Sequence, residues 1–154
     1  MTMKRRTFIT NALVGGAAAA GAALLPRAAF SADWPKDAFE AKSVSDALSK
    51  LLGSSDQTES ADITIKAPDI AENGAVVPVQ VTATMPNVES ISIIAEKNPV
   101  PLIASFQFGD NGAGFVSTRI KMGKTSNVIA VVKADGKLFS AKKEVKVTIG
   151  GCGG

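Results

Sequence analysis

Histidine and tyrosine are absent from this 154-residue chain, and cysteine occurs only once. Without histidine the chain lacks the commonest metal ligand and the commonest general base at neutral pH. We therefore do not expect a zinc site or a catalytic triad within the chain. A single cysteine also permits no internal disulfide, so the fold must be stabilised by packing. We expect no cofactor and no metal ion to be bound by this chain.

Basic residues outnumber acidic residues by 17 to 14, but the excess lies at the amino terminus. Residues 1–32 contain Lys4, Arg5, Arg6 and Arg27 and no acidic residue. The remaining chain has 13 basic and 14 acidic residues, which gives a formal charge of −1. A mature protein with that balance is not expected to bind nucleic acid or anionic lipid through a basic patch.

Residues 1–32 have the pattern of a twin-arginine (Tat) signal peptide. Arg5-Arg6 precede a weakly apolar run, rich in Ala and Gly, that ends at Pro26. The run is too short and too rich in glycine to favour a membrane anchor. We expect cleavage near Ala32 and a mature protein in the periplasm. Because this route moves folded proteins, we also expect export together with a partner subunit.

Residues 33–60 are expected to form an N-terminal helix and a linker. Apolar side chains between Lys36 and Leu52 recur at three- and four-residue spacing, which predicts one amphipathic helix. Gly53 marks its end, and the polar residues 54–60 predict the linker. The helix has no dense basic face, so we expect it to pack against the domain or a partner and not in a membrane interface.

Residues 61–149 show the alternation of apolar and polar side chains that is typical of half-buried strands. Turn signals rich in Asn, Asp, Gly and Pro divide this segment into about seven short strands. The pattern predicts an all-β, immunoglobulin-like β-sandwich. The strands are expected near residues 61–67, 76–85, 90–97, 101–108, 115–121, 127–133 and 138–149.

Three local features refine this expectation. Pro78 cannot donate to a strand ladder, which favours an edge position for its strand. Asp135-Gly136 predicts a type I′ turn between the last two strands. Arg119 and Lys121 share one strand face, which is either a solvated face or a face that binds a partner.

The chain ends in a glycine-rich arm that carries the only cysteine. Its residues are Gly150, Gly151, Cys152, Gly153 and Gly154. Glycine places almost no steric limit on the backbone, so we expect a flexible swinging arm that extends from the end of the last strand. Three residues past Ile149 give it a reach of at most about 10 Å. Cys152 has no neighbour in the sequence that would lower the pKa of its thiol, so it is better suited to being modified than to catalysing.

The residues alone leave three uses for this thiol open. The first is covalent attachment of a substrate that separate enzymes then modify. The second is a structural or adhesive periplasmic sandwich whose cysteine forms an intermolecular disulfide, although that use does not require glycine on both sides. The third, an enzyme in its own right, is opposed by the absence of histidine.

The tail resembles the carrier motif of SoxY, the sulfur-carrier family of the bacterial Sox thiosulfate-oxidation system. Gly-Gly-Cys-Gly-Gly at the terminus carries most of this resemblance. The stretches at residues 70–78, 96–99, 119–128 and 145–149 are also similar to that family, and so is the Tat-type leader.

This resemblance implies a periplasmic sulfur carrier with several partners. SoxY-like proteins pair with a small β-sandwich subunit, SoxZ, as a heterodimer. A c-type haem enzyme would conjugate thiosulfate to the thiol of Cys152, and a manganese hydrolase would then release sulfate. A sulfane dehydrogenase, where present, would oxidise the remaining sulfur. Haem and manganese would belong to these partners, and this chain would be a non-catalytic carrier.

Overall fold

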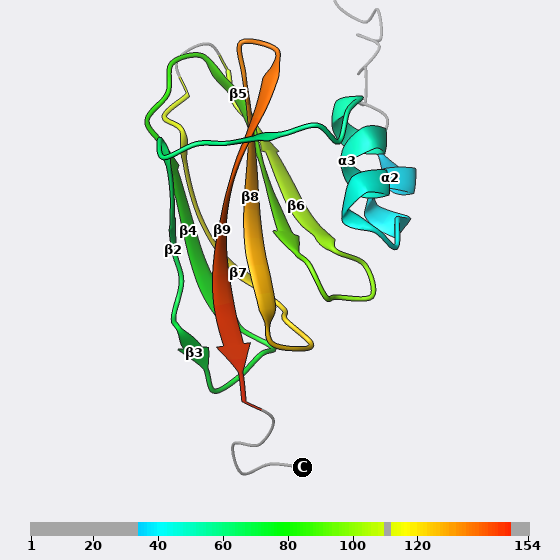
Figure 1. The fold of residues 1–154 in the computed structure, drawn as a ribbon, viewed down its shortest axis with the longest axis vertical. Helices are drawn as coiled ribbons and strands as arrows, with labels where there is room; N and C mark the ends of the chain where they lie inside the picture. Colours follow the sequence, from blue (N-terminus) through cyan, green and yellow to red (C-terminus); the bar gives the residue numbers. More distant parts are fainter. Residues whose placement is uncertain (1–33, 110–111, 149–154) are drawn as a thin grey trace, which may run out of the picture. The chain divides into compact units, whose positions relative to one another are not determined.

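The computed structural model describes residues 34–109 and 112–148, and it contains two sheets and two helices (Figure 1). The chain divides into Met1–Trp34 and Pro35–Gly154, and every helix and strand of the described ranges lies in the second unit. No helix in the described ranges is long and apolar enough to cross a membrane. The elements are α2 (Lys36–Glu40), α3 (Val44–Leu52), β1 (Thr58–Glu59), β2 (Ile63–Lys66), β3 (Ile70–Ala71), β4 (Val77–Ala83), β5 (Val88–Ala95), β6 (Leu102–Gln107), β7 (Phe115–Ile120), β8 (Ser126–Ala134) and β9 (Lys137–Val147).

The two sheets enclose the main hydrophobic core. The larger sheet has the strand order β1-β9-β8-β5-β6, with β3 also paired to β9, and the smaller has the order β2-β4-β7. Inward side chains from both sheets, including Val79, Ile93 and Val132, are fully buried in one cluster. Seven of the strands follow the segments that alternation predicted. The all-β, immunoglobulin-like sandwich is thereby confirmed.

The helices cover the outer face of the larger sheet and close a second core. Ala38 of α2 and Leu48 of α3 are buried there against Leu102, Val131 and Leu138 of the sheet. The expectation that the helical segment packs against the domain is therefore confirmed.

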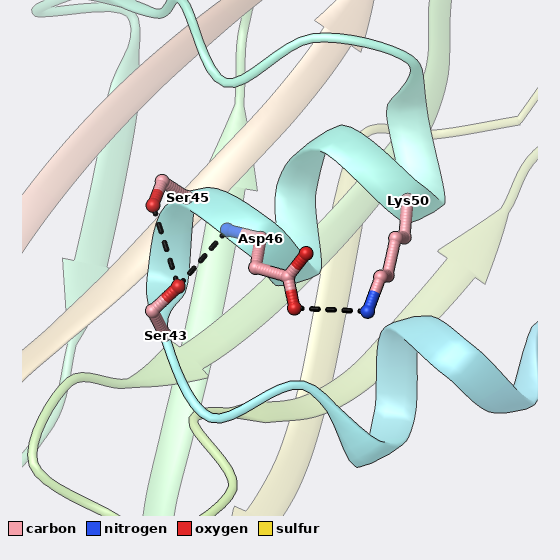
Figure 2. Close-up of polar contacts among 4 residues, drawn as sticks. All are labelled: Ser43, Ser45, Asp46 and Lys50. Atoms are coloured by element: carbon pink, nitrogen blue, oxygen red, sulfur yellow. Dashed lines mark hydrogen bonds and ion pairs between the residues drawn. The ribbon is translucent and has the colours of Figure 1, made fainter.

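The prediction of one continuous helix over residues 36–52 was wrong, because the chain is extended between α2 and α3. Ala41 has φ and ψ of −60° and 142°. Ser43 begins α3 as its N-cap, and its Oγ accepts a hydrogen bond from the Asp46 N–H at 3.2 Å (Figure 2). That bond satisfies a free amide of the first helical turn and stabilises a new start. Gly53 ends α3 with φ of 81°, as predicted.

The expectation that Pro78 marks an edge strand was also wrong, because β4 is the middle strand of the smaller sheet. Pro78 pairs with Arg119 of β7. On the other side β2 ends at Lys66, which pairs with Gln80, so no β2 residue lies opposite the proline. Pro78 therefore removes no ladder hydrogen bond on the β2 side. Arg119 and Lys121 are exposed, and the partner-binding alternative for their face stays a prediction.

β9 is the 11-residue strand that ends at the tail, and it follows the predicted type I′ turn. Asp135 and Gly136 have φ of 49° and 70°, as that turn requires. The side chains of β9 alternate as predicted, with Val145 buried in the main core and Lys146 exposed. The sequence did not predict β1, which lies in the supposed linker, or β3. Two-residue strands contain too little alternation to be recognised.

Candidate functional site at the end of the last strand

The predicted site residues lie beyond the described part of the chain, which ends at Thr148. These residues are Gly150, Gly151, Cys152, Gly153 and Gly154, together with Ile149 before them. The structure does describe the surface from which this tail departs. We call this surface the arm root and define it as residues 69–74, 121–125 and 145–148. In Figure 1 it lies around the end of the β9 arrow.

On one edge, β3 holds the end of β9. The two strands run parallel, with Ala71 opposite Val147. The Lys146 N–H donates to Asp69 O at 2.9 Å. One step further, the Thr148 N–H donates to Ala71 O at 3.1 Å. The ladder with β3 therefore reaches the last described residue.

On the other edge, β8 stops before β9 does, and a side chain takes its place. The last pair between the two strands joins Ser126 to Val145. Beyond it, the Val147 N–H donates to Thr125 Oγ1 at 2.9 Å. The same hydroxyl donates to Val147 O at 3.4 Å. One threonine side chain thus satisfies both backbone groups of Val147, because a hydroxyl donates one hydrogen bond and accepts others.

The turn between β3 and β4 passes close to the end of β9 and to the connection between β7 and β8. Asn73 Oδ1 accepts the Ala75 N–H at 2.9 Å and shapes the turn. The Met122 N–H donates to Gly74 O at 2.7 Å. A Cβ at Gly74 would lie 2.8 Å from Val147 Cγ1 and would also overlap Met122 O. Glycine is required here by the close approach of three segments.

The side chain of Asn98 holds the connection that carries Thr125. Its Nδ2 donates to Lys121 O at 2.7 Å, and its Oδ1 accepts the Gly123 N–H at 2.9 Å. The turn between β5 and β6 is thereby joined to the connection between β7 and β8. Both halves of the amide are used, so the connection is held at two points.

Lys143 holds the segment that leads into β3. It lies on the core-facing side of β9 near Val145, where a lysine was unexpected among apolar side chains. Its Nζ donates to Ala67 O at 2.7 Å and lies 3.1 Å from Asp69 Oδ1. The apolar stem is partly buried, and the charged group reaches the edge of the sheet.

The resolved carboxylate pKa shifts are explained by surface ion pairs near the start and middle of β9. A hydrogen bond from Lys133, and then one from the Gly136 N–H, hold the pKa of Glu89 below its ordinary value. A hydrogen bond from Lys142 lowers the pKa of Glu59. Among the described residues, no cluster of three or more acidic, Cys or His side chains could hold a metal ion.

Sequence reasoning located the tail but missed the residues that hold its base. Thr125, Asn98 and Gly74 lie in the stretches that carried the resemblance, and these stretches meet at the arm root. Turn signals were visible at Asn98 and Gly74. Nothing in the sequence indicates that the Thr125 hydroxyl reaches Val147, because that contact joins residues 22 positions apart.

Comparison with known proteins agrees with the resemblance. The model of the family described as "Sulfur oxidation protein SoxY" matches residues 48–152. The solved structure of the sulfur carrier protein SoxY from Chlorobium limicola f thiosulfatophilum is 48% identical, with a TM-score of 0.62. The match covers 68% of this chain and 94% of that one.

More distant structures share the fold alone. A superoxide reductase (neelaredoxin) from Ignicoccus hospitalis is 21% identical, with a TM-score of 0.50, over 56% of this chain and 80% of that one. A variant of the same protein matches at the same identity and TM-score over 60% and 81%. No curated protein matches the chain.

Proposed function

Because this chain belongs to the SoxY family of sulfur carriers, we propose that it holds thiosulfate-derived sulfur covalently on Cys152 and presents it to separate enzymes. The coarser point follows from the family: the chain is a carrier of the Sox system and not an enzyme. The position of Cys152 supports the more specific proposal, that sulfur is attached covalently to this residue. It is the only cysteine, the family match ends on it, and it lies four residues after Thr148, the last residue whose backbone is held at the arm root.

Loading joins Cys152 Sγ to the outer sulfur of thiosulfate. The thiol loses its proton, two electrons would leave one at a time through the haem of the conjugating enzyme, and the product is Cys–S–S–SO3⁻. An unperturbed cysteine has a pKa of about 8.5, so only a few per cent is thiolate near pH 7. Because the step removes two electrons, the carrier depends on the partner for the oxidation.

Unloading cleaves the bond between sulfur and the sulfonate group. Water supplies the fourth oxygen of sulfate in the manganese hydrolase, and the sulfane sulfur stays on Cys152 as a persulfide. A sulfane dehydrogenase, where present, oxidises that sulfur so that a second hydrolysis can follow. The haem and the manganese belong to these enzymes, and the carrier needs no cofactor of its own.

The proposal also covers where the carrier works. The leader over residues 1–32, with Arg5-Arg6, supports export by the twin-arginine route and a mature protein in the periplasm. A small β-sandwich subunit of the SoxZ type is the partner with which the folded chain would be exported. The heterodimer would then present the arm to the enzymes.

Intact-mass spectrometry of the protein from the periplasm of thiosulfate-grown cells tests this function. We expect a chain cleaved near Ala32, co-purifying with a smaller subunit, and carrying adducts on Cys152 that match a thiosulfonate or a persulfide. The Cys152→Ser variant should purify with the same partner and carry no adduct, since the residue follows β9 and is no part of it.

Three outcomes would contradict the proposal. A periplasmic protein with an unmodified thiol under all growth conditions would show that Cys152 does not receive the substrate. A population linked through Cys152 as a disulfide dimer would support the structural alternative instead. Recovery of the chain from the cytoplasm alone would contradict export.

A further inference from the structure

We propose that Thr125 is a positioning residue, whose hydroxyl closes the ladder at the end of β9 and so fixes the point at which the arm begins. The inference rests on the proposed function, because it concerns how the carrier delivers Cys152. Thr125 and Val147, whose contacts carry the inference, both lie in the arm root. Its first two tests, hydrogen exchange and paramagnetic broadening, need no sulfur chemistry.

The position of Thr125 in the ladder is unusual. In an antiparallel pair, the backbone of the neighbouring strand supplies the donor and the acceptor for each bonded residue. Here β8 has its last pair at Ser126 and Val145. For Val147 both groups are met by the Thr125 side chain, at 2.9 Å for the N–H and 3.4 Å for the carbonyl oxygen. An aliphatic side chain of the same shape, such as valine, could do neither.

The contacts on the two edges act on successive residues. Thr125 holds Val147 from the β8 side, and Ala71 holds the Thr148 N–H from the β3 side at 3.1 Å. Asn98 in turn fixes the connection that presents Thr125, through Lys121 and Gly123. The backbone is therefore held at Val147 on the β8 edge and at Thr148 on the β3 edge.

The starting point of the arm determines how far the thiol ranges. From Thr148, Cys152 is four residues away and can lie at most about 14 Å from it. If the end of β9 left both edges, losing its bonds to Asp69 and Ala71 together with those to Thr125, the free segment would begin after Val145 and would be seven residues long. The effective concentration of the thiol at a fixed point then falls about twofold, because it scales as roughly the −3/2 power of length. Because glycine places little limit on the backbone, the arm cannot replace the constraint on its direction that the held end of β9 provides.

The test compares Thr125→Val, which keeps the branched shape without the hydroxyl, with Thr125→Ser, which keeps the hydroxyl. Hydrogen exchange of the Val147 amide is the first readout. We expect wild type and Thr125→Ser to be protected alike and Thr125→Val to exchange about fivefold faster, as loss of one hydrogen bond predicts. Thr125 is exposed, so none of these changes opens the core.

A nitroxide on Cys152 gives the second readout, because the chain has no other cysteine. Its paramagnetic broadening of backbone amide signals maps where the label goes. In wild type and Thr125→Ser we expect broadening concentrated at the arm root. In Thr125→Val we expect it to be weaker there and to spread to amides further from the end of β9.

Loading by the haem enzyme, at limiting carrier, is the third readout. It should fall about twofold in Thr125→Val, with alkylation of Cys152 by iodoacetamide unchanged in all three proteins. The inference is overturned if Thr125→Val matches wild type in exchange and in broadening. If Thr125→Val unfolds, Thr125→Ala is measured by the same two methods. A wild-type protein that never loads contradicts the proposed function, and the exchange and broadening results still decide the role of Thr125.

Discussion

Gly74 lies in the turn between β3 and β4, where three segments of the chain come close together. Among the described glycines, positive φ occurs at Gly53 and Gly136 but not at Gly74. Its lack of a side chain is needed for space, since a Cβ would meet both Val147 Cγ1 and Met122 O. The Asn73-Gly74 pair correctly indicated a turn, but the reason for the glycine is a tertiary contact.

We therefore expect Gly74→Ala to destabilise the protein by about 1–3 kcal/mol, the usual cost of overpacking. Backbone oxygen cannot move aside as a flexible side chain would, so the strain must be taken up by the turn or by β9. Urea unfolding measures the change in the free energy of unfolding. Gly109→Ala is the matched control, because no atom lies within 4 Å of its added Cβ. Equal effects of the two substitutions would contradict this account.

The two kinds of site residue differ in how far the sequence reveals them. Cys152 could be found from composition, because a single cysteine between glycine pairs is a local pattern. Thr125 could not, because its role depends on where β8 stops relative to β9. Threonine in a polar connection is otherwise an ordinary residue. The candidate thiol could therefore be recognised from the sequence, and the contacts at the arm root could not.

The α2–α3 segment shows how a local capping signal overrides helical periodicity. Ser43-Val44-Ser45-Asp46 contains the serine and acidic residue, three positions apart, that typify a helix start. The Ser43 hydroxyl caps Asp46, and Lys50 pairs with Asp46 at 2.9 Å one turn later (Figure 2). The apolar spacing continues through the break, so periodicity alone merged the two helices.

Removing this cap should weaken the element that covers the second core. We expect Ser43→Ala to lower the free energy of unfolding by about 1 kcal/mol. Ser49→Ala in the same helix should be neutral or slightly stabilising, because Ser49 is exposed and alanine is the better helix former. Thermal unfolding of the two variants measures the difference. Ser43→Ala and Ser49→Ala having the same effect would show that Ser43 is not the cap.

Strand segments were predictable to the extent that they alternate over enough residues. The seven longer strands and the turn at Asp135-Gly136 were all found from local pattern. β1 and β3 were not, and both pair in parallel with β9 across long sequence separations. The middle position of β4 was likewise hidden, because strand order depends on long-range pairing.

At the scale of the molecule, β9 ends at the arm root, where residues 69–74, 121–125 and 145–148 meet and Asn98 joins them. The hairpin turn at Asp135-Gly136 lies at the start of β9, and the arm root lies at its end. Four residues separate Cys152 from Thr148, so the chain between them spans at most about 14 Å. Under the proposed function, any enzyme that receives the thiol must therefore approach this end of the sandwich.

Two exposed apolar side chains make that requirement testable. Ile70 of β3 is 57% exposed at the arm root, opposite Lys146. Phe115 is 50% exposed but begins β7, about 17 Å along the strand from Ile120, which lies near the arm root. We expect Ile70→Ser to raise the KM of the partner enzyme about fivefold, since an interface contact of this size is worth about 1 kcal/mol.

Phe115→Ser should leave that KM unchanged, and both variants should unfold like wild type because the side chains are exposed. Steady-state kinetics with the loaded carrier as substrate gives KM and kcat separately. We expect KM to change and kcat to be retained, since the substitutions leave the thiol and its arm intact. If the two serine variants raise KM equally, the approach is not confined to the arm root. If only Phe115→Ser raises KM, the enzyme docks at the opposite end of the sandwich. The arm must then reach further than it could from the held end of β9.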